Sequence, residues 1–208
     1  MFCGKTEDLL KEPFLKEGFY GATDRHTAIC ISDKKINLPF QEKKGSPLIS
    51  AVIPKTKGNP VTIDVLKLED ALMKECPQVD EMVGVMTKCV ECNGHGETSC
   101  PVCCNLHECP VCEGIGKIFK GESTGKKISD FDMPVYFLGA YIKGTYLMRL
   151  VQASKLLGCK SILRLAGTER NGNYFKAGDF DFILMPINVD LNAQWVNLNY
   201  QGEKQLTK

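Results

Sequence analysis

Seven of the chain's eleven cysteines lie within about thirty residues, between Lys88 and Lys117. Two thiolates separated by two residues can bind one tetrahedral zinc ion from a single tight turn, and a second such turn completes four ligands. The stretch contains three pairs with this spacing, namely Cys89/Cys92, Cys100/Cys103 and Cys109/Cys112. The chemistry indicated is therefore zinc binding by thiolates.

The first and third pairs share a longer signature, C-x-x-C-x-G-x-G, in which the glycines let the backbone turn with φ > 0 beneath the metal. Because only these two pairs carry the glycines, we assign one closed structural zinc site to Cys89, Cys92, Cys109 and Cys112. The pair Cys100/Cys103 leaves two interpretations open. It either binds a second zinc ion together with Cys104 or His107, or it closes the hairpin between the knuckles without metal.

Two other roles for the cysteines fit the sequence less well. Disulfides belong to oxidising compartments, and the N-terminal MFCGKTEDLL lacks the charged-then-apolar pattern of a secretory signal. A redox pair of the thioredoxin kind needs a βα context that the flanking glycines do not supply. The other four cysteines are scattered as buried thiols usually are, so we expect a cytoplasmic protein.

Composition indicates a globular chain without a membrane span. Its 208 residues are 43% hydrophobic, and 26 Lys and Arg stand against 25 Asp and Glu. Net charge therefore gives no argument for nucleic-acid binding, which would need a local basic surface. No Ser-His-Asp set, catalytic carboxylate pair or phosphate loop is present, so we expect a protein that is not an enzyme.

Hydrophobic periodicity predicts strands and two amphipathic helices around the cysteines. A helix is expected over residues 62–76 with Asp64 as its N-cap, and a second over residues 144–157. The expected strands cover residues 19–31 (a hairpin), 48–53, 82–87, 116–120, 135–141, 161–166, 174–177 and 180–185. A helix followed by antiparallel strands thus occurs twice, which predicts an α+β fold of βαβββ units with the helices on one face. This α+β domain would be residues 1–87 and 118–208, with residues 88–117 as an inserted zinc module.

The cysteine stretch resembles the cysteine-rich zinc region of DnaJ-type co-chaperones, which is built from C-x-x-C-x-G-x-G repeats. The resemblance covers about thirty residues; the middle pair lacks its glycines, and the fourth repeat of the family is absent. It implies zinc as cofactor and offers one function, that of a zinc-dependent chaperone or assembly factor.

The flanking segments resemble the bacterial sliding clamp, the β-subunit of the replicative DNA polymerase. GFYGATDRHTAICIS is similar to the clamp's A-T-D-G-H-R-L strand pair, and SAVIPK to its V-x-V-P-R-K strand end. The run from YIKGTYLMRL to FDFILMPINV is similar to the closing helix-and-strands unit, which ends in a Met-Pro pair. The resemblance implies a DNA-clamp fold and a non-enzymatic role in DNA replication or repair.

Site residues follow from the clamp resemblance by position. A groove for partner peptides would involve Thr23, His26, Met185 and Pro186. Arg25 and Thr27 depart from the family's glycine and arginine in this turn. Contacts to double-stranded DNA phosphates would come from polar helix faces, with Lys67, Lys74, Arg149 and Lys155 as candidates.

The partners implied are double-stranded DNA and replication proteins. The family builds a ring from three domains per chain, whereas this chain supplies little more than one, so a ring would need a homo-oligomer. A third hypothesis, a thiol oxidoreductase, would use Cys100 and Cys103.

Overall fold

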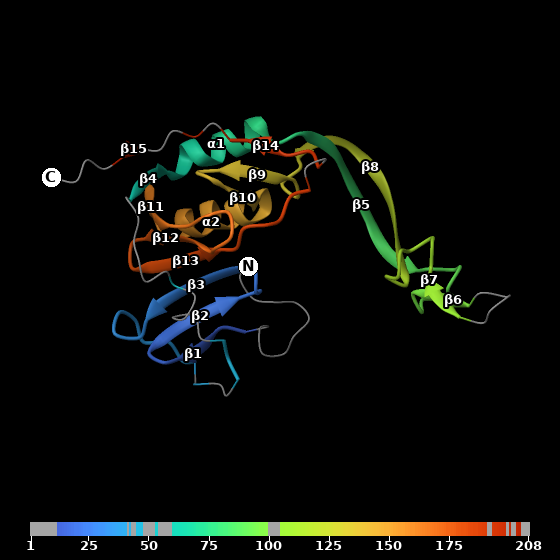
Figure 1. The fold of residues 1–208 in the computed structure, drawn as a ribbon, viewed down its shortest axis with the longest axis horizontal. Coiled ribbons are helices and arrows are strands. Elements are labelled where there is room, and N and C mark those ends of the chain that lie inside the picture. Colours follow the sequence, from blue (N-terminus) through green and yellow to red (C-terminus); the bar gives the residue numbers. More distant parts are fainter. Residues whose placement is uncertain are drawn as a thin grey trace. The chain divides into compact units, whose positions relative to one another are not determined.

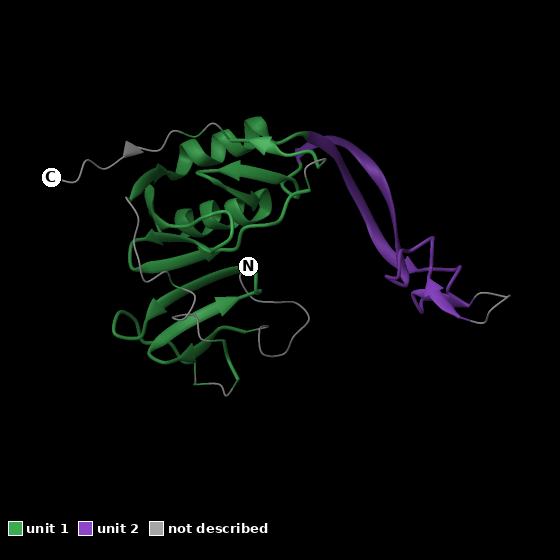
Figure 2. Cartoon of the chain, viewed as in Figure 1, with its two compact units in different colours: residues 1–77, 130–208 green, residues 78–129 purple. Residues whose placement is uncertain are grey.

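The computed structural model describes residues 12–40, 42, 45–47, 53, 60–99, 105–190, 193–198, 200 and 203–204 (Figure 1). The chain forms two compact units, one of residues 1–77 and 130–208 and one of residues 78–129 (Figure 2). The expected strand at residues 48–53 and the cysteines Cys100, Cys103 and Cys104 lie outside the described residues, Ile53 excepted.

The first unit is built on an antiparallel sheet with the strand order β1-β2-β3-β13-β12-β11-β4-β15. Its strands are β1 (Phe14–Lys16), β2 (Phe19–Thr23), β3 (Thr27–Ser32), β4 (Val61–Asp64), β11 (Ser161–Ala166), β12 (Asn173–Ala177), β13 (Phe180–Leu184) and β15 (Glu203–Lys204). A smaller sheet has the order β10-β9-β14, from β9 (Pro134–Phe137), β10 (Ala140–Lys143) and β14 (Val196–Asn197), which runs parallel to β9. Mostly antiparallel sheet with helices is the α+β class that the sequence predicts.

Two helices, α1 (Val65–Glu75) and α2 (Gly144–Leu156), lie within the predicted ranges, but residues 62–64 belong to β4 and not to the first helix. Asp64 is confirmed as the N-cap of α1, because its side chain accepts a hydrogen bond from the Lys67 N–H at 3.0 Å. Both helices turn an apolar stripe toward one core, which joins them to both sheets; its fully buried members include Leu68, Leu72, Leu147, Leu150, Phe137, Phe175 and Phe182. Among the described residues, no helix is long and apolar enough to span a bilayer.

One expected strand of the first unit is divided in the structure. The run expected as one strand over residues 135–141 is two strands, β9 and β10, joined at Leu138 and Gly139 with φ of 49° and 84°. Paired left-handed residues are typical of tight hairpin turns, but the apolar run around Gly139 hid this one.

The second unit is a two-stranded antiparallel ribbon of β5 (Gln78–Lys88) and β8 (Lys117–Ser129). Both strands are longer than expected, and β8 takes up most of the polar stretch 121–132 that was expected to lie outside strands. Neither face of the ribbon has a second layer in this unit, so its strands need no apolar-polar alternation. Beyond the ribbon, β6 (Glu97–Ser99) pairs with β7 (Leu106–Glu108).

The βαβββ repeat can be followed along the chain, as β4-α1-β5-β8-β9 and then β10-α2-β11-β12-β13. In the first copy, however, β5 and β8 pair with each other and join neither sheet of the first unit. The second unit, residues 78–129, thus contains two strands of the repeat.

Candidate metal centre

Two copies of the same backbone turn hold the first and third cysteine pairs. In one copy Asn93, Gly94 and Gly96 have φ of 52°, 81° and 82°, and in the other Glu113, Gly114 and Gly116 have φ of 49°, 81° and 73°. Left-handed conformations are unfavourable for most residues other than glycine, which explains why C-x-x-C-x-G-x-G recurs.

The two knuckles hydrogen-bond to each other reciprocally. The Cys89 N–H donates to the Gly116 carbonyl at 2.9 Å, and the Cys109 N–H donates to the Gly96 carbonyl at 2.7 Å. There is no room for side chains at this crossing, because a Cβ on Gly96 would lie 2.2 Å from the Gly114 carbonyl oxygen. The glycines therefore allow the turns to pack together as well as to form.

This packing gathers the four thiols predicted as ligands. The Sγ atoms of Cys89, Cys92, Cys109 and Cys112 all lie within 4.8 Å of one another, and all four residues are buried. Cys89 and Cys109 are 3.9 Å apart at sulfur, and Cys92 and Cys112 are 3.6 Å apart. Tetrahedral Zn–S bonds of about 2.3 Å place sulfurs about 3.8 Å apart, whereas a disulfide needs about 2.05 Å. The spacing fits one zinc ion and excludes disulfides among these four cysteines.

Backbone donors favour thiolates at this cluster. The Gly96 N–H donates to Cys92 Sγ at 3.3 Å, and the Gly116 N–H donates to Cys112 Sγ at 3.2 Å. Burial opposes ionisation, but the Gly96 N–H and the neighbouring thiols lower the pKa of Cys92 to about 7. Burial and the neighbouring sulfurs raise the pKa of Cys112 to about 12, since a second negative charge beside the first is unfavourable without a cation.

The cluster has no open ligand position. Four sulfurs complete a tetrahedral zinc site, which is the arrangement of structural rather than catalytic zinc. His107 lies exposed on β7 and is not among the four clustered ligands. A second site with Cys100, Cys103 and Cys104 stays a prediction.

The turn that carries Thr23 and His26 meets the strand end that carries Met185. The Met185 N–H donates to the His26 carbonyl at 2.8 Å, just beyond the paired strands β3 and β13. Their side chains have different surroundings. Met185 packs with the cluster that includes Ala28 and Tyr174, and the exposed His26 ring stacks on Tyr146 at 5.9 Å. Pro186 is half-buried, and a peptide groove at this place stays a prediction.

The same turn is tied to α2 by an ion pair that the sequence did not indicate. Arg149 pairs with Asp24, whose carboxylate also accepts the Thr27 N–H at 2.7 Å. Burial opposes ionisation of Asp24, but the hydrogen bonds from Thr27 and Arg149 hold its pKa below the usual value. Arg25 at the turn has φ of 75°, a left-handed conformation that glycine adopts more readily than other residues.

The four cations proposed for DNA differ in their surroundings. Lys67 and Lys74 are exposed on α1, and Lys74 lies 3.6 Å from a Glu75 carboxylate oxygen. Lys155 lies 2.9 Å from both carboxylate oxygens of Glu69, and Arg149 is held by Asp24. Three of the four cations thus have a carboxylate partner within the chain, and the exposed Lys74–Glu75 pair is the longest of the three.

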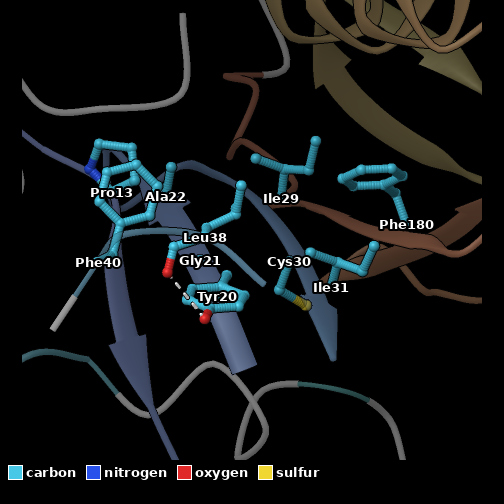
Figure 3. Close-up of a pocket in the computed structure, with 10 residues that line it drawn as sticks. All are labelled: Pro13, Tyr20, Gly21, Ala22, Ile29, Cys30, Ile31, Leu38, Phe40 and Phe180. Atoms are coloured by element: carbon cyan, nitrogen blue, oxygen red, sulfur yellow. Dashed lines mark hydrogen bonds between the residues drawn. The ribbon is translucent and has the colours of Figure 1, made fainter. Parts of the chain in front are cut away.

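An apolar pocket of about 160 Å³ lies on the part of the main sheet formed by β2 and β3 (Figure 3). The Tyr20 hydroxyl donates to the Leu38 carbonyl at 3.0 Å and closes one side of it. Sequence reasoning missed this pocket, although the alternation of Tyr20 with Ala22 and of Ile29 with Ile31 was visible. Its other lining residues are Pro13, Gly21, Cys30, Phe40 and Phe180, so it involves none of the four residues proposed for peptide binding.

Comparison with known proteins gives matches among solved structures alone. No family model matches the chain, and no curated protein matches it. A crystal structure of the DNA polymerase III subunit beta from Pseudomonas aeruginosa is 11% identical with a TM-score of 0.47, over 90% of this chain and 61% of that one. The beta subunit from Thermotoga maritima is 10% identical with a TM-score of 0.47, over 91% of this chain and 61% of that one. The sliding clamp from Bacillus subtilis is 11% identical with a TM-score of 0.44, over 90% of this chain and 60% of that one.

The chain therefore spans about 60% of the length of these sliding-clamp chains. At this level of similarity, function has to be argued from the chain's own residues.

Proposed function

We propose that this protein is a non-enzymatic, clamp-like accessory protein of DNA replication or repair, whose insertion is held together by one structural zinc ion. The observation that carries the zinc part is the cluster of four buried thiols within 4.8 Å of one another. The clamp-like part is supported by the sequence resemblance together with the hydrogen bond that joins its two separated motifs at His26 and Met185.

Zinc would supply most of the folding energy of the knuckles. Their buried cluster consists of the four cysteines with Ile118 packed against them, which is too little apolar material for a core. In such modules the free energy of metal binding is largely the free energy of folding. Chelation should therefore unfold residues 88–117 while the main sheet, which has its own core, survives.

The test is the zinc content of a double variant. Cys89→Ser with Cys112→Ser removes one ligand from each knuckle and should lower zinc content by one equivalent. Cys159→Ser is the matched control, because Cys159 lies outside the cluster near the end of α2. Unchanged zinc content in the double variant would show that these cysteines are not the ligands.

A peptide groove is proposed between the Thr23–His26 turn and the Met185-Pro186 strand end. It is supported by the Met185–His26 backbone hydrogen bond and by the Asp24–Arg149 ion pair, which fixes the turn against α2. An apolar recess beside a few fixed polar groups is a common peptide site. Binding of a short apolar peptide should weaken in Met185→Ala, with the pocket variant Phe40→Ala as control.

DNA binding is proposed for the exposed face of α1. It should be independent of sequence and weaken with salt, because lysines contact phosphates without reading bases. Four cations would give a log-log salt slope of about −3 to −4, but Arg149 and Lys155 are paired with carboxylates. The two lysines of α1 give a slope of about −2. Negligible retention on both circular and linear DNA, with zinc bound, would remove the clamp function.

A second candidate function is a chaperone or assembly factor that binds other chains through the insertion. It is favoured by the exposed apolar side chains of the second unit, such as Val83, Val85 and Val90. Retention of the protein on an unfolded model substrate but not on DNA would support this function over the clamp.

A further inference from the structure

The ribbon of the second unit carries an apolar face. Directly paired residues of an antiparallel ribbon point to the same side, and the side alternates along each strand. The register Met86↔Phe119, Gly84↔Gly121 and Met82↔Ser123 therefore places Met82, Met86 and Phe119 on one face, which we call the ribbon face. These three side chains are 49%, 53% and 50% exposed.

Gly84 and Gly121 pair with each other at the centre of the ribbon face, beside Met82, Met86 and Phe119. A Cβ on Gly121 would lie 2.4 Å from Cε1 of Phe119, which shows that the aromatic ring lies across this glycine. Exposed apolar surface of this kind marks an interaction site more often than a free surface.

The ribbon cannot cover this surface by itself. It is a two-stranded sheet in its own unit, and its opposite face is also apolar, with Val83 and Val85 exposed. Isolated two-stranded hairpins are marginally stable in water and gain stability when a further layer packs on them.

The charges of the second unit indicate which surface would complement the ribbon face. Residues 89–116, which we call the knuckle module, contain no lysine, arginine or aspartate and carry four exposed glutamates, Glu91, Glu97, Glu108 and Glu113. Four thiolates around one Zn²⁺ add a further net charge of −2. The ribbon strands carry five lysines against three carboxylates, a net charge of +2. Two of these lysines, Lys88 and Lys117, pair with each other and lie on the ribbon face, because each is two residues from Met86 or Phe119 along its strand.

The knuckle module also presents apolar side chains. Val90 and Val111 lie between the ligating cysteines of the two knuckles, and Ile115 lies between the paired glycines of the second. Because the four thiols point inward at the metal, these side chains point outward, and Val90 is 79% exposed. An acidic surface with aliphatic side chains complements a basic surface with Met and Phe.

We propose that two copies of this chain pair through their insertions, with the knuckle module of each seated on the ribbon face of the other. An isologous dimer needs a surface that is complementary to itself across a twofold axis. One unit that carries both an acidic aliphatic module and a basic apolar ribbon meets this need in antiparallel pairing. The pairing rests on a folded knuckle module, which the zinc ion of the proposed function would hold together.

Self-association of the full, zinc-loaded chain should be measured by sedimentation equilibrium at several salt concentrations. The wild type should dimerise, and the dimer should weaken as salt rises. Lys88→Glu with Lys117→Glu should weaken it about tenfold, since exposed pairs on the ribbon face change from attraction to repulsion at two symmetric contacts. Glu91→Lys with Glu113→Lys should have the same effect. All four substitutions together should restore the wild-type affinity.

A matched control keeps the interpretation specific. Lys67→Glu with Lys74→Glu reverses two exposed lysines of α1 and should leave dimerisation unchanged. Met86→Thr with Phe119→Thr should weaken it by at least about tenfold through lost apolar burial. A monomeric wild type, a charge swap that fails to restore the dimer, or an equal loss in the α1 control overturns the pairing.

Zinc content measured on the same samples distinguishes a failure of the pairing proposal from a failure of the proposed zinc site. A chain that binds no zinc but still shows charge-swap rescue overturns the metal centre and keeps the pairing. A chain that binds one zinc ion and stays monomeric keeps the metal centre and overturns the pairing.

Discussion

Replacing Gly96 by alanine tests the crossing of the two knuckles. Gly96 has φ of 82°, and an added Cβ would lie 2.2 Å from the Gly114 carbonyl oxygen. That oxygen belongs to the backbone, so it can move only if the second knuckle shifts. Gly125 is the matched control in the same unit, because it has φ of 75° and no atom within 4 Å of an added Cβ.

The size of the effect follows from what the shift would disrupt. A left-handed conformation costs alanine about 1–2 kcal/mol at either position. At Gly96 the shift also weakens two hydrogen bonds, from the Cys109 N–H to the Gly96 carbonyl and from the Gly96 N–H to Cys92 Sγ, each contributing about 1 kcal/mol. Zinc binding should weaken by about 3 kcal/mol, or roughly a hundredfold. In Gly125→Ala only the conformational cost applies. Because Gly125 is far from the four cysteines in sequence, this cost should leave zinc affinity almost unchanged.

Competition with a zinc chelator under reducing conditions measures this difference. Gly116→Ala should behave like Gly96→Ala, since its Cβ would lie 2.4 Å from the Gly94 carbonyl oxygen. The reasoning is refuted if Gly96→Ala binds zinc as tightly as wild type, or if Gly125→Ala loses as much affinity as Gly96→Ala.

Three further substitutions test the first unit. Asp24→Asn should lower the free energy of unfolding by about 2 kcal/mol at neutral pH. The depressed pKa of Asp24 stabilises the fold above its ordinary pKa near 4, so the difference from wild type should shrink as pH falls below about 4, in denaturant titrations at each pH. Tyr174→Phe removes the hydroxyl that donates to Asp181 Oδ1 at 2.6 Å and should cost about 1–3 kcal/mol by thermal unfolding. Lys67→Ala with Lys74→Ala should reduce the salt slope of DNA retention by about 2, and an unchanged slope would place the DNA contacts elsewhere.

The clustering of Cys89, Cys92, Cys109 and Cys112 could be predicted because their motif dictates local geometry. C-x-x-C-x-G-x-G fixes both the turn and the direction of its sulfurs, and the glycine count separated the first and third pairs from Cys100 and Cys103. The helices were predictable for a similar reason, since α1 has a capping residue at Asp64 and an apolar stripe on one face. Local rules sufficed for these two features.

Long-range pairing escaped the sequence. Arg149 was assigned to DNA because it lies on the polar side of a helix, yet it pairs with Asp24, which lies 125 residues earlier. No local pattern marks such a contact. The ribbon was predicted too short because strands with water on both faces lack the apolar alternation that reveals a half-buried strand.

The way the chain leaves and rejoins the first unit explains how that unit tolerates the insertion. The Asp130 N–H donates to the Pro77 carbonyl at 2.8 Å, so the chain departs and returns at one place and closes the first unit there. At the other end of the ribbon, Lys88 pairs with Lys117, and the Cys89 N–H continues the ladder to the Gly116 carbonyl. The knuckles therefore follow directly from a hairpin whose register is already set. Each unit has its own buried cluster. A substitution that disrupts the four-cysteine cluster should therefore leave the sheet that carries the Thr23–His26 turn folded.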